Sequence, residues 1–457
     1  MSASTDGGDA AEIAQLEELE SRPFLPRLGG YLRWMGPGYL QSAMTLGGGS
    51  AFAAIFSGAA FGYQLLWVAP LGMLLGVIVL SAVAHQTLST DEDPYQALKE
   101  RAHPLFAYAF AWGGLLSSVV WQFAQYALAS AMIVLLAGQL GIALERWHAG
   151  LIALAWCVSV TALYGSGSKV VRLYETVLKF LVWGIVLCFA FVVFRTGIPE
   201  PGQVLSGFVP SLPEDFKGVS ARTVIVSGLA AAVGANMLFV YPYTLRRRGW
   251  GKSHRRLARY DLIFGMLLPF SIAVTLMVVA NAAVFHYLEP ELFAGKKIAP
   301  DQVARIFADP ERLGEAAGLW AFGLGILAMA LSSITMQMLA SGYACAELFG
   351  WREGTPLFQL GRHLPAIGVL GAVFWGDMVA WVPVPTNILS GLLLPAAYLG
   401  FLVLHGKRSY LGDATPSGIV GALWKLGMLA AVGVLLSALG TVAVNDLPGF
   451  LERLGLG

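Results

Sequence analysis

The chain has 457 residues, of which 57% are hydrophobic and only 12% are charged. A soluble domain carries roughly a quarter charged residues, so this composition excludes a soluble globular protein. The apolar runs are continuous, which disfavours a barrel of alternating strands, and the net charge of +1 indicates no nucleic-acid partner. We therefore expect an all-α polytopic membrane protein.

The chain begins with a polar, acidic stretch that lacks the basic and apolar parts of a signal peptide, and we expect residues 1–30 to be a disordered cytoplasmic tail. Eleven apolar segments follow, each long enough to cross a bilayer. They lie near residues 32–60, 63–86, 105–138, 148–165, 170–195, 221–246, 257–287, 316–348, 364–381, 383–405 and 416–444.

The distribution of basic residues predicts the orientation of these spans. With the amino terminus in the cytoplasm, 18 of the 29 Lys and Arg residues lie inside, nine lie outside and two lie within spans. The excess of basic residues on the cytoplasmic side predicts an internal amino terminus and an external carboxyl terminus in the cell membrane. The strongest single signal is the segment LRRRGWGKSHRRLAR after the sixth span, and binding of lipid headgroups there stays open as a second role.

Two spans contain residues that interrupt a helix. The first places Gly47, Gly48 and Gly49 together in mid-membrane, and the sixth places Gly234, Asn236 and Pro242 at a similar depth. Irregular backbone is tolerated there only where protein covers it or where it lines a cavity, so both breaks should face one site. Close helix packing is the other explanation of a glycine cluster.

The spacing of the two breaks predicts an inverted repeat. They lie in spans one and six, so residues 31–195 (spans one to five) and 221–405 (spans six to ten) form the two repeats, with 416–445 as an eleventh span. Such a repeat places substrate at the midplane between the broken helices, as in a secondary transporter.

The segment GPGYLQSAMTLGGGSAFAAIFSGAAFGYQLLWV resembles the first span of the Nramp (natural resistance-associated macrophage protein) family of proton-coupled divalent-metal transporters. VGANMLFVYPY, SSIT and NILSGLLLP in spans six, eight and ten resemble the same family. The resemblance covers nearly all of the chain after residue 30 and implies a LeuT-type fold, with a 5+5 inverted repeat and an eleventh helix.

The family's ligands are replaced at the matching positions. Its Asp-Pro-Gly-Asn motif falls on Gly47 to Ser50, and its Met-Pro-His motif falls on Leu238 to Val240. Its acidic pair in span three, which the resemblance implies to be part of a proton route, falls on Gln122 and Gln125. Ala235 and Asn387 alone keep ligand character.

The charged and sulfur-bearing residues in the spans suggest no other metal centre. Glu175 and Lys179 are four residues apart and are interpreted as a mutual ion pair. The remaining charges are interpreted as helix-end residues, namely Asp261, Glu347, Asp377 and Lys425. The three cysteines have no CxxC spacing and predict neither a disulfide framework nor a zinc site, and no cofactor is expected.

A site without acids but with converging backbone N–H groups suits a carboxylate, and Gly47, Gly48, Gly49 and Ser50 are the candidate cradle. Aromatic side chains could hold an ammonium group. The sequence therefore predicts a betaine-like or amino-acid-like zwitterion as substrate, with packing as the alternative role of the aromatics. The further candidate substrate-binding residues are Trp121, Gln122, Gln125, Asn236, Phe239, Tyr241 and Asn387.

Ser332 and Ser333 in span eight match hydroxyl ligands of sodium in LeuT-type symporters, so Na⁺ is a candidate coupling ion, with uniport or a purely structural role as alternatives. The alternative substrate is a divalent metal ion, Mg²⁺ or Mn²⁺, bound through carbonyls, amides and Ser50. A sensor that has lost transport stays open, whereas no protease motif is complete, so an enzyme is not expected. The oligomeric state is left open.

Overall fold

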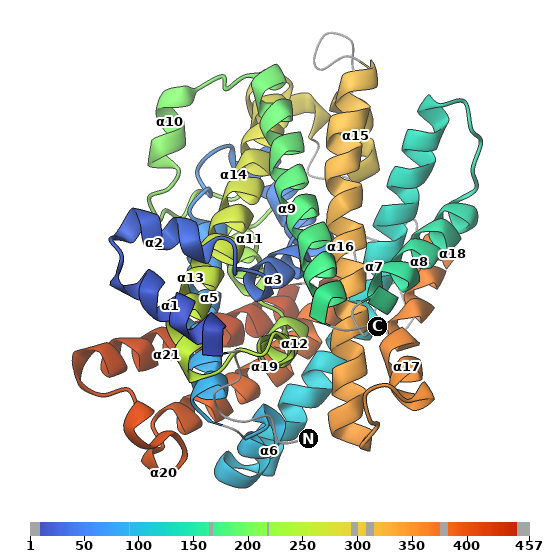
Figure 1. Ribbon diagram of the computed structural model, residues 1–457. Coiled ribbons are helices and arrows are strands. Elements are labelled where there is room, and N and C mark those ends of the chain that lie inside the picture. The colour runs from blue at the N-terminus through green and yellow to red at the C-terminus, as the bar shows by residue number, and fades with distance from the viewer. Residues whose placement is uncertain are drawn as a thin grey trace.

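The computed structural model describes residues 10–90, 92–163, 168–216, 219–293, 300–307, 315–374 and 383–445 (Figure 1). These residues are almost entirely helical. Among them, seven helices are long and apolar enough to cross a membrane, or eight if a bent pair counts as one span. Helices α8 and α19 and the second broken pair occupy the other segments expected to span, so the all-α polytopic architecture is confirmed.

The first half of the chain forms five successive spans. Their helices are α3 (Pro37–Thr45) with α4 (Gly48–Phe61), α5 (Val68–Ser89), α7 (Pro104–Gln139), α8 (Arg146–Leu163) and α9 (Ser168–Thr196). The turn between α5 and α7 holds the short helices α6 (Pro94–Ala97) and η1 (Leu98–Ala102). The helix α10 (Pro201–Ser206) follows α9.

The second half repeats the broken-helix arrangement. Its first span is α11 (Ala221–Ala231) with α12 (Ala235–Arg247), and its second is the continuous run of α13 (Arg255–Asp261), η3 (Leu262–Leu267), α14 (Leu268–Ala282) and η4 (Ala283–Leu288). The third span is α16 (Glu315–Phe349). The fourth runs from α17 (Pro356–His363) through η6 (Leu364–Leu370) to α18 (Gly371–Phe374), and the fifth is α19 (Pro383–His405). The shorter elements are η2 (Lys252–His254), η5 (Pro290–Leu292), α15 (Pro300–Phe307), α20 (Arg408–Leu411) and η8 (Gly412–Ala414), and α21 (Gly418–Asn445) is the last span. The exact boundaries of the two repeats stay a prediction.

Both breaks lie close to the expected positions. Helices α3 and α4 meet at residues 46–47 with a bend of 58°. Helices α11 and α12 are separated by residues 232–234. Pro242, which was expected to interrupt span six, instead lies inside α12, and Gly48 and Gly49 open α4. The interruption is thus narrower than the sequence suggested.

The long helices α7 and α16 pack along each other and form the centre of the bundle, with α16 running through the height of the molecule in Figure 1. Both broken spans contact this pair, since α16 packs on α3 and α7 packs on α12. The breaks are therefore covered by protein, which is the condition for irregular backbone at membrane depth.

Part of the expected tail is folded. Residues 10–31 form α1 (Ala10–Ser21) and α2 (Phe24–Tyr31), which lie beside α13 (Figure 1). The Tyr31 hydroxyl donates to Glu20 Oε1 (3.2 Å), and Arg27 Nη2 donates to the Tyr260 hydroxyl (3.3 Å). Burial, with the neighbouring carboxylate of Glu20, raises the pKa of Tyr31 to about 12, so the hydroxyl keeps its proton at a higher pH than a free tyrosine does. Residues 10–31 are thus helical and held by tertiary contacts, which composition does not reveal.

Candidate functional site

The two breaks meet at the thioether of Met237. The sulfur lies 3.2 Å from Thr45 Oγ1, at the end of α3, and 3.4 Å from the backbone nitrogen of Gly234, which precedes α12. Met237 is 3% exposed and belongs to the first turn of α12. A thioether sulfur therefore lies at the junction of the two broken spans.

The glycine segment of the first break is held by its own side chains. The Gly47 N–H donates to Ser50 Oγ (3.1 Å), and Ser50 Oγ lies 3.0 Å from the Thr45 carbonyl oxygen and 2.9 Å from that of Gly47. The Gly48 N–H donates to Gln125 Oε1 (3.0 Å). Two of the backbone N–H groups proposed to hold a carboxylate are thus already bonded within the protein.

Side chains of α7 and α16 form hydrogen bonds with the same break. Gln125 Nε2 donates to Ser333 Oγ (3.1 Å), which also accepts from Gln337 Nε2 (3.0 Å). The Ser333 hydroxyl donates to the Met44 carbonyl oxygen (3.1 Å), and that of Ser332 to the Ala43 carbonyl oxygen (3.0 Å). The structure therefore brings both serines to the first break, on the last carbonyls of α3.

Close approach of α7 explains the glycines at the break. A Cβ on Gly47 would lie 2.5 Å from Gln125 Nε2, and one on Gly49 would lie 2.9 Å from Cη2 of Trp121. A Cβ on Gly48 would meet its nearest neighbour, Gln125 Oε1, at an ordinary 3.5 Å. Gln125 and Trp121 thus lie at the break, as expected, but as packing partners of the glycines.

Two other predicted residues make hydrogen bonds to the backbone. Gln122 Nε2 donates to the Ile334 carbonyl oxygen of α16 (3.1 Å), and Asn236 Oδ1 accepts from the neighbouring Met237 N–H (2.9 Å). Asn387 lies on α19, in a stretch whose side chains fall outside the described residues. Of these, Asn236 lies beside the junction through the Met237 N–H, while Gln122 ties α7 to α16.

The aromatic residues of span six are packed into the core. The Phe239 ring stacks on Tyr243, with centroids 5.0 Å apart, and contacts Phe110 at 4.7 Å. Tyr243 stacks in turn on Tyr343 (5.2 Å), and Tyr241 is fully buried. Because the rings of Phe239 and Tyr243 pack against other rings and Tyr241 is buried, these side chains do not form an open cage for an ammonium group.

A partly open pocket lies beside α4. Apart from Ser50, Ser57 and Thr275, its lining is apolar, with side chains such as Leu65 and Phe270. An ion that loses part of its hydration shell needs oxygen or sulfur ligands in its place. The polar groups at the Met237 junction are therefore better suited to a cation than this pocket.

Sequence reasoning missed the position of Met237 and the role of Asp261. The Met-Pro-His motif was aligned with Leu238 to Val240, which left out the adjacent Met237. Its place in the first turn after the predicted break could have indicated that it lies at the site. Asp261, interpreted as a helix-end residue, is fully buried and accepts from the N–H groups of Gly36 (3.0 Å) and Gly38 (2.5 Å) at the start of α3. The described residues contain no group of three or more His, Cys, Asp or Glu that could hold a metal ion.

The predicted pair of Glu175 and Lys179 is also wrong. Glu175 Oε2 lies 3.5 Å from Arg248 Nη1. Lys179 Nζ instead donates to the Leu32 carbonyl oxygen (3.3 Å) and lies 4.9 Å from the centre of the Tyr39 ring. Tertiary packing thus supplies each charge with a partner other than its helical neighbour.

Known proteins resemble the chain along almost its whole length. It is 24% identical over 449 residues to the divalent metal cation transporter MntH of Nostoc sp., covering 92% of this chain and 95% of the relative. It is 25% identical over 419 residues to divalent metal cation transporter MntH 1 of Pseudomonas aeruginosa, covering 88% and 90%. The crystal structure of a mutant of the Eremococcus coleocola manganese transporter superposes with a TM-score of 0.76 at 17% identity, covering 94% of this chain and 92% of that one.

These relatives contradict a zwitterion as the principal substrate. They are named as metal cation transporters, and the candidate cradle and cage are filled by the protein's own groups. The model of the family described as Nramp, natural resistance-associated macrophage protein-like, matches residues 38–443. The chain thus belongs to the Nramp family, a family of membrane transporters rather than enzymes, and has its all-α, LeuT-type fold.

Proposed function

We propose that this chain carries divalent metal ions of the first transition row, represented by Mn²⁺, across the membrane. The observation that carries the proposal is the Met237 sulfur at the junction of the two broken helices. The names of the relatives support the same substrate class. A thioether is a soft ligand that Mg²⁺, a hard cation with oxygen ligands, does not favour.

The remaining ligands would be neutral. Thr45 Oγ1 and Gln125 Oε1 lie at the first break together with backbone carbonyls, and no acidic side chain makes a described contact with these atoms. A divalent ion in such a site would gain little from charge compensation and would keep part of its water shell. We therefore expect weak, readily reversible binding, which suits a carrier.

Replacing the sulfur tests the proposal directly. Met237→Leu keeps an apolar side chain of similar volume but removes the thioether, so the affinity for Mn²⁺ should fall about tenfold, or roughly 1.4 kcal/mol. Isothermal titration calorimetry on the purified protein measures this, with Mg²⁺ titrated in parallel. The matched control is Met428→Leu, at a fully buried methionine on the last span. Unchanged Mn²⁺ affinity in Met237→Leu, or no Mn²⁺ binding to the unsubstituted protein, would contradict the proposal.

Transport should depend little on a pH gradient. The amides of Gln122 and Gln125 are fixed by hydrogen bonds to α16 and cannot take up a proton near neutral pH as carboxylates can. Uptake of Mn²⁺ into proteoliposomes, with the membrane potential clamped, should differ less than about twofold with and without an inward proton gradient, because no buried acid at these positions shifts its protonation. Acceleration by an order of magnitude would show that another group carries protons.

Orientation and coupling complete the proposal. The excess of basic residues on one side supports a cell-membrane protein with its amino terminus in the cytoplasm and its carboxyl terminus outside. Coupling to Na⁺ through Ser332 and Ser333 stays a prediction that the same proteoliposomes test when external sodium is replaced by choline.

A further inference from the structure

The helix α12 ends in three consecutive arginines, Arg246, Arg247 and Arg248. Successive residues of an α-helix project about 100° apart, so three in a row point in three directions. Arg248, the residue after the helix, still has helical backbone angles (φ −72°, ψ −13°). The run can therefore reach three different neighbours at once.

Each arginine pairs with a carboxylate on a different element. The closest N···O distances are 3.2 Å for Arg246 and Asp93, 3.2 Å for Arg247 and Glu353, and 3.5 Å for Arg248 and Glu175. Asp93 precedes α6, Glu353 lies in the turn between α16 and α17, and Glu175 belongs to α9. The end of α12 is thus tied to three parts of the chain that lie far apart in sequence.

The pair of Glu175 and Arg248 is the most buried of the three, with 6% and 14% of the side chains exposed. Glu175 also lies against the residue that precedes α3, since a Cβ on Gly36 would be in contact with its Oε2. Asp261 holds the same segment through the N–H groups of Gly36 and Gly38. The carboxylate of Glu175 therefore lies between the residue that precedes α3 and the end of α12.

We propose that Arg246, Arg247 and Arg248, with Asp93, Glu353 and Glu175, form a latch that holds α12 against α9, α16 and the α5–α7 turn and keeps the site closed on that face. Opening this face requires α12 to separate from these elements, which breaks the three pairs together. In the open state the arginines are solvated by water instead. This inference concerns access to the site and does not depend on which ion is carried.

Topology is the other role that three arginines could have. An excess of basic residues orients membrane proteins whether or not carboxylates face them. Variants of the carboxylates, which leave every arginine in place, therefore separate the two roles. Asp93→Asn is suited to this purpose, because Asp93 Oδ1 accepts from the N–H groups of Tyr95 and Gln96 and an asparagine keeps that cap.

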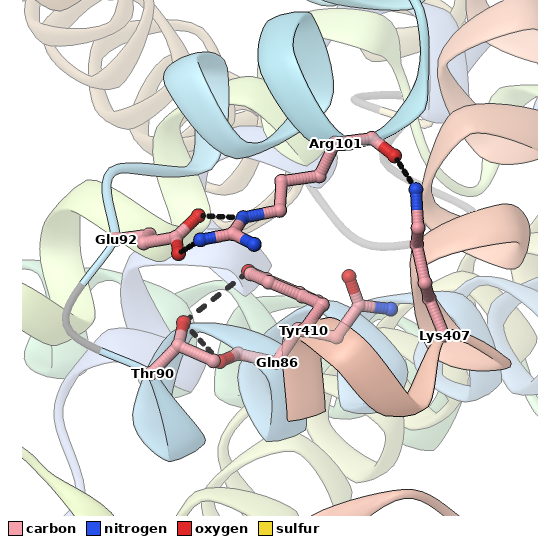
Figure 2. A network of polar contacts seen from close by, with 6 residues as sticks. All are labelled: Gln86, Thr90, Glu92, Arg101, Lys407 and Tyr410. Carbon is pink, nitrogen blue, oxygen red and sulfur yellow. Dashed lines mark hydrogen bonds and ion pairs between the residues drawn. The ribbon is translucent and has the colours of Figure 1, made fainter. Parts of the chain in front are cut away.

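The neighbouring residue Glu92 provides a matched control. Figure 2 shows its carboxylate paired with Arg101, whose carbonyl oxygen accepts from Lys407, while the Thr90 hydroxyl bonds to Tyr410. This network joins the α5–α7 turn to the region of α20, and the pairs drawn in it do not include the three arginines of α12. Glu92→Gln thus removes a different ion pair from the same turn and leaves all six latch residues in place.

Electron–electron double resonance measures the opening. Nitroxide labels are placed at Ser253→Cys, after α12, and Leu357→Cys, on α17, both exposed positions, and the native cysteines Cys157, Cys188 and Cys345 are replaced by alanine. Each of Asp93→Asn and Glu353→Gln should raise the ratio of long to short distances roughly two- to fivefold, as exposed pairs do. The triple variant with Glu175→Gln should raise it more than about tenfold, since that pair is buried.

The result that overturns the latch is a distance distribution in the triple variant equal to that of Glu92→Gln. If the triple variant does not fold, as judged by size-exclusion chromatography, the double variant Asp93→Asn with Glu353→Gln decides, because both of its pairs are partly exposed. An unchanged distribution in the double variant then contradicts the proposal equally.

Discussion

Gly47→Ala should reduce transport of Mn²⁺ ten- to hundredfold, whereas Gly48→Ala, one residue later, should change it less than about threefold. A Cβ on Gly47 would lie 2.5 Å from Gln125 Nε2 and 3.0 Å from Ser333 Oγ, and both atoms are held by further hydrogen bonds. Overpacking of this kind costs about 1–3 kcal/mol, and each 1.4 kcal/mol corresponds to tenfold. A Cβ on Gly48 makes only ordinary contacts.

Uptake into proteoliposomes, normalised to the amount of folded protein, measures both variants. Gly433→Ala is the control, because a Cβ on this exposed glycine of α21 meets no heavy atom within 4 Å. Equal activity of Gly47→Ala and Gly48→Ala would mean that the hydrogen bonds of Gln125 and Ser333 to the first break are not needed for transport.

Asp261→Ala should destabilise the protein by about 2–5 kcal/mol, since it leaves the N–H groups of Gly36 and Gly38 without their buried acceptor. The fully buried carboxylate also faces the start of α3, where the helix dipole favours a negative charge. Asp261→Asn should cost less, because its amide oxygen still accepts one bond.

Thermal unfolding in detergent, followed by the loss of monodisperse protein, ranks these variants. Asp413→Ala is the control, because Asp413 is exposed in the turn before α21. An apparent Tm of Asp261→Ala equal to that of the control would show that the start of α3 is held by other contacts. Asp261→Ala should also widen the distribution of distances between nitroxide labels at positions 253 and 357. The reason is that Asp261 and Glu175 both contact the residues at the start of α3.

Local patterns were enough to predict the membrane class, the two broken spans and the family. Hydropathy and glycine content are properties of a short stretch of chain. The residues that separate α3 from α4 and α11 from α12 can therefore be recognised in the sequence itself. Gln125 was predicted as a substrate-binding residue, and the structure places it at the first break, bonded to Gly48 and Ser333. The substrate class was predicted wrongly, because the converging N–H groups were counted as free when Ser50 and Gln125 accept from two of them.

The sequence by itself determined that this is a many-helix membrane protein with two helices broken at mid-depth, because bilayer insertion and helix propensity depend on residues close together in the chain. Tertiary structure alone decided which groups meet. Glu175 had a helical neighbour of opposite charge at Lys179 but pairs with Arg248, and Met237 bonds across to Thr45. Helix packing determines which residues far apart in sequence come into contact. The nearest neighbour of a buried charge or sulfur therefore depends on the tertiary structure and not on its position along the chain.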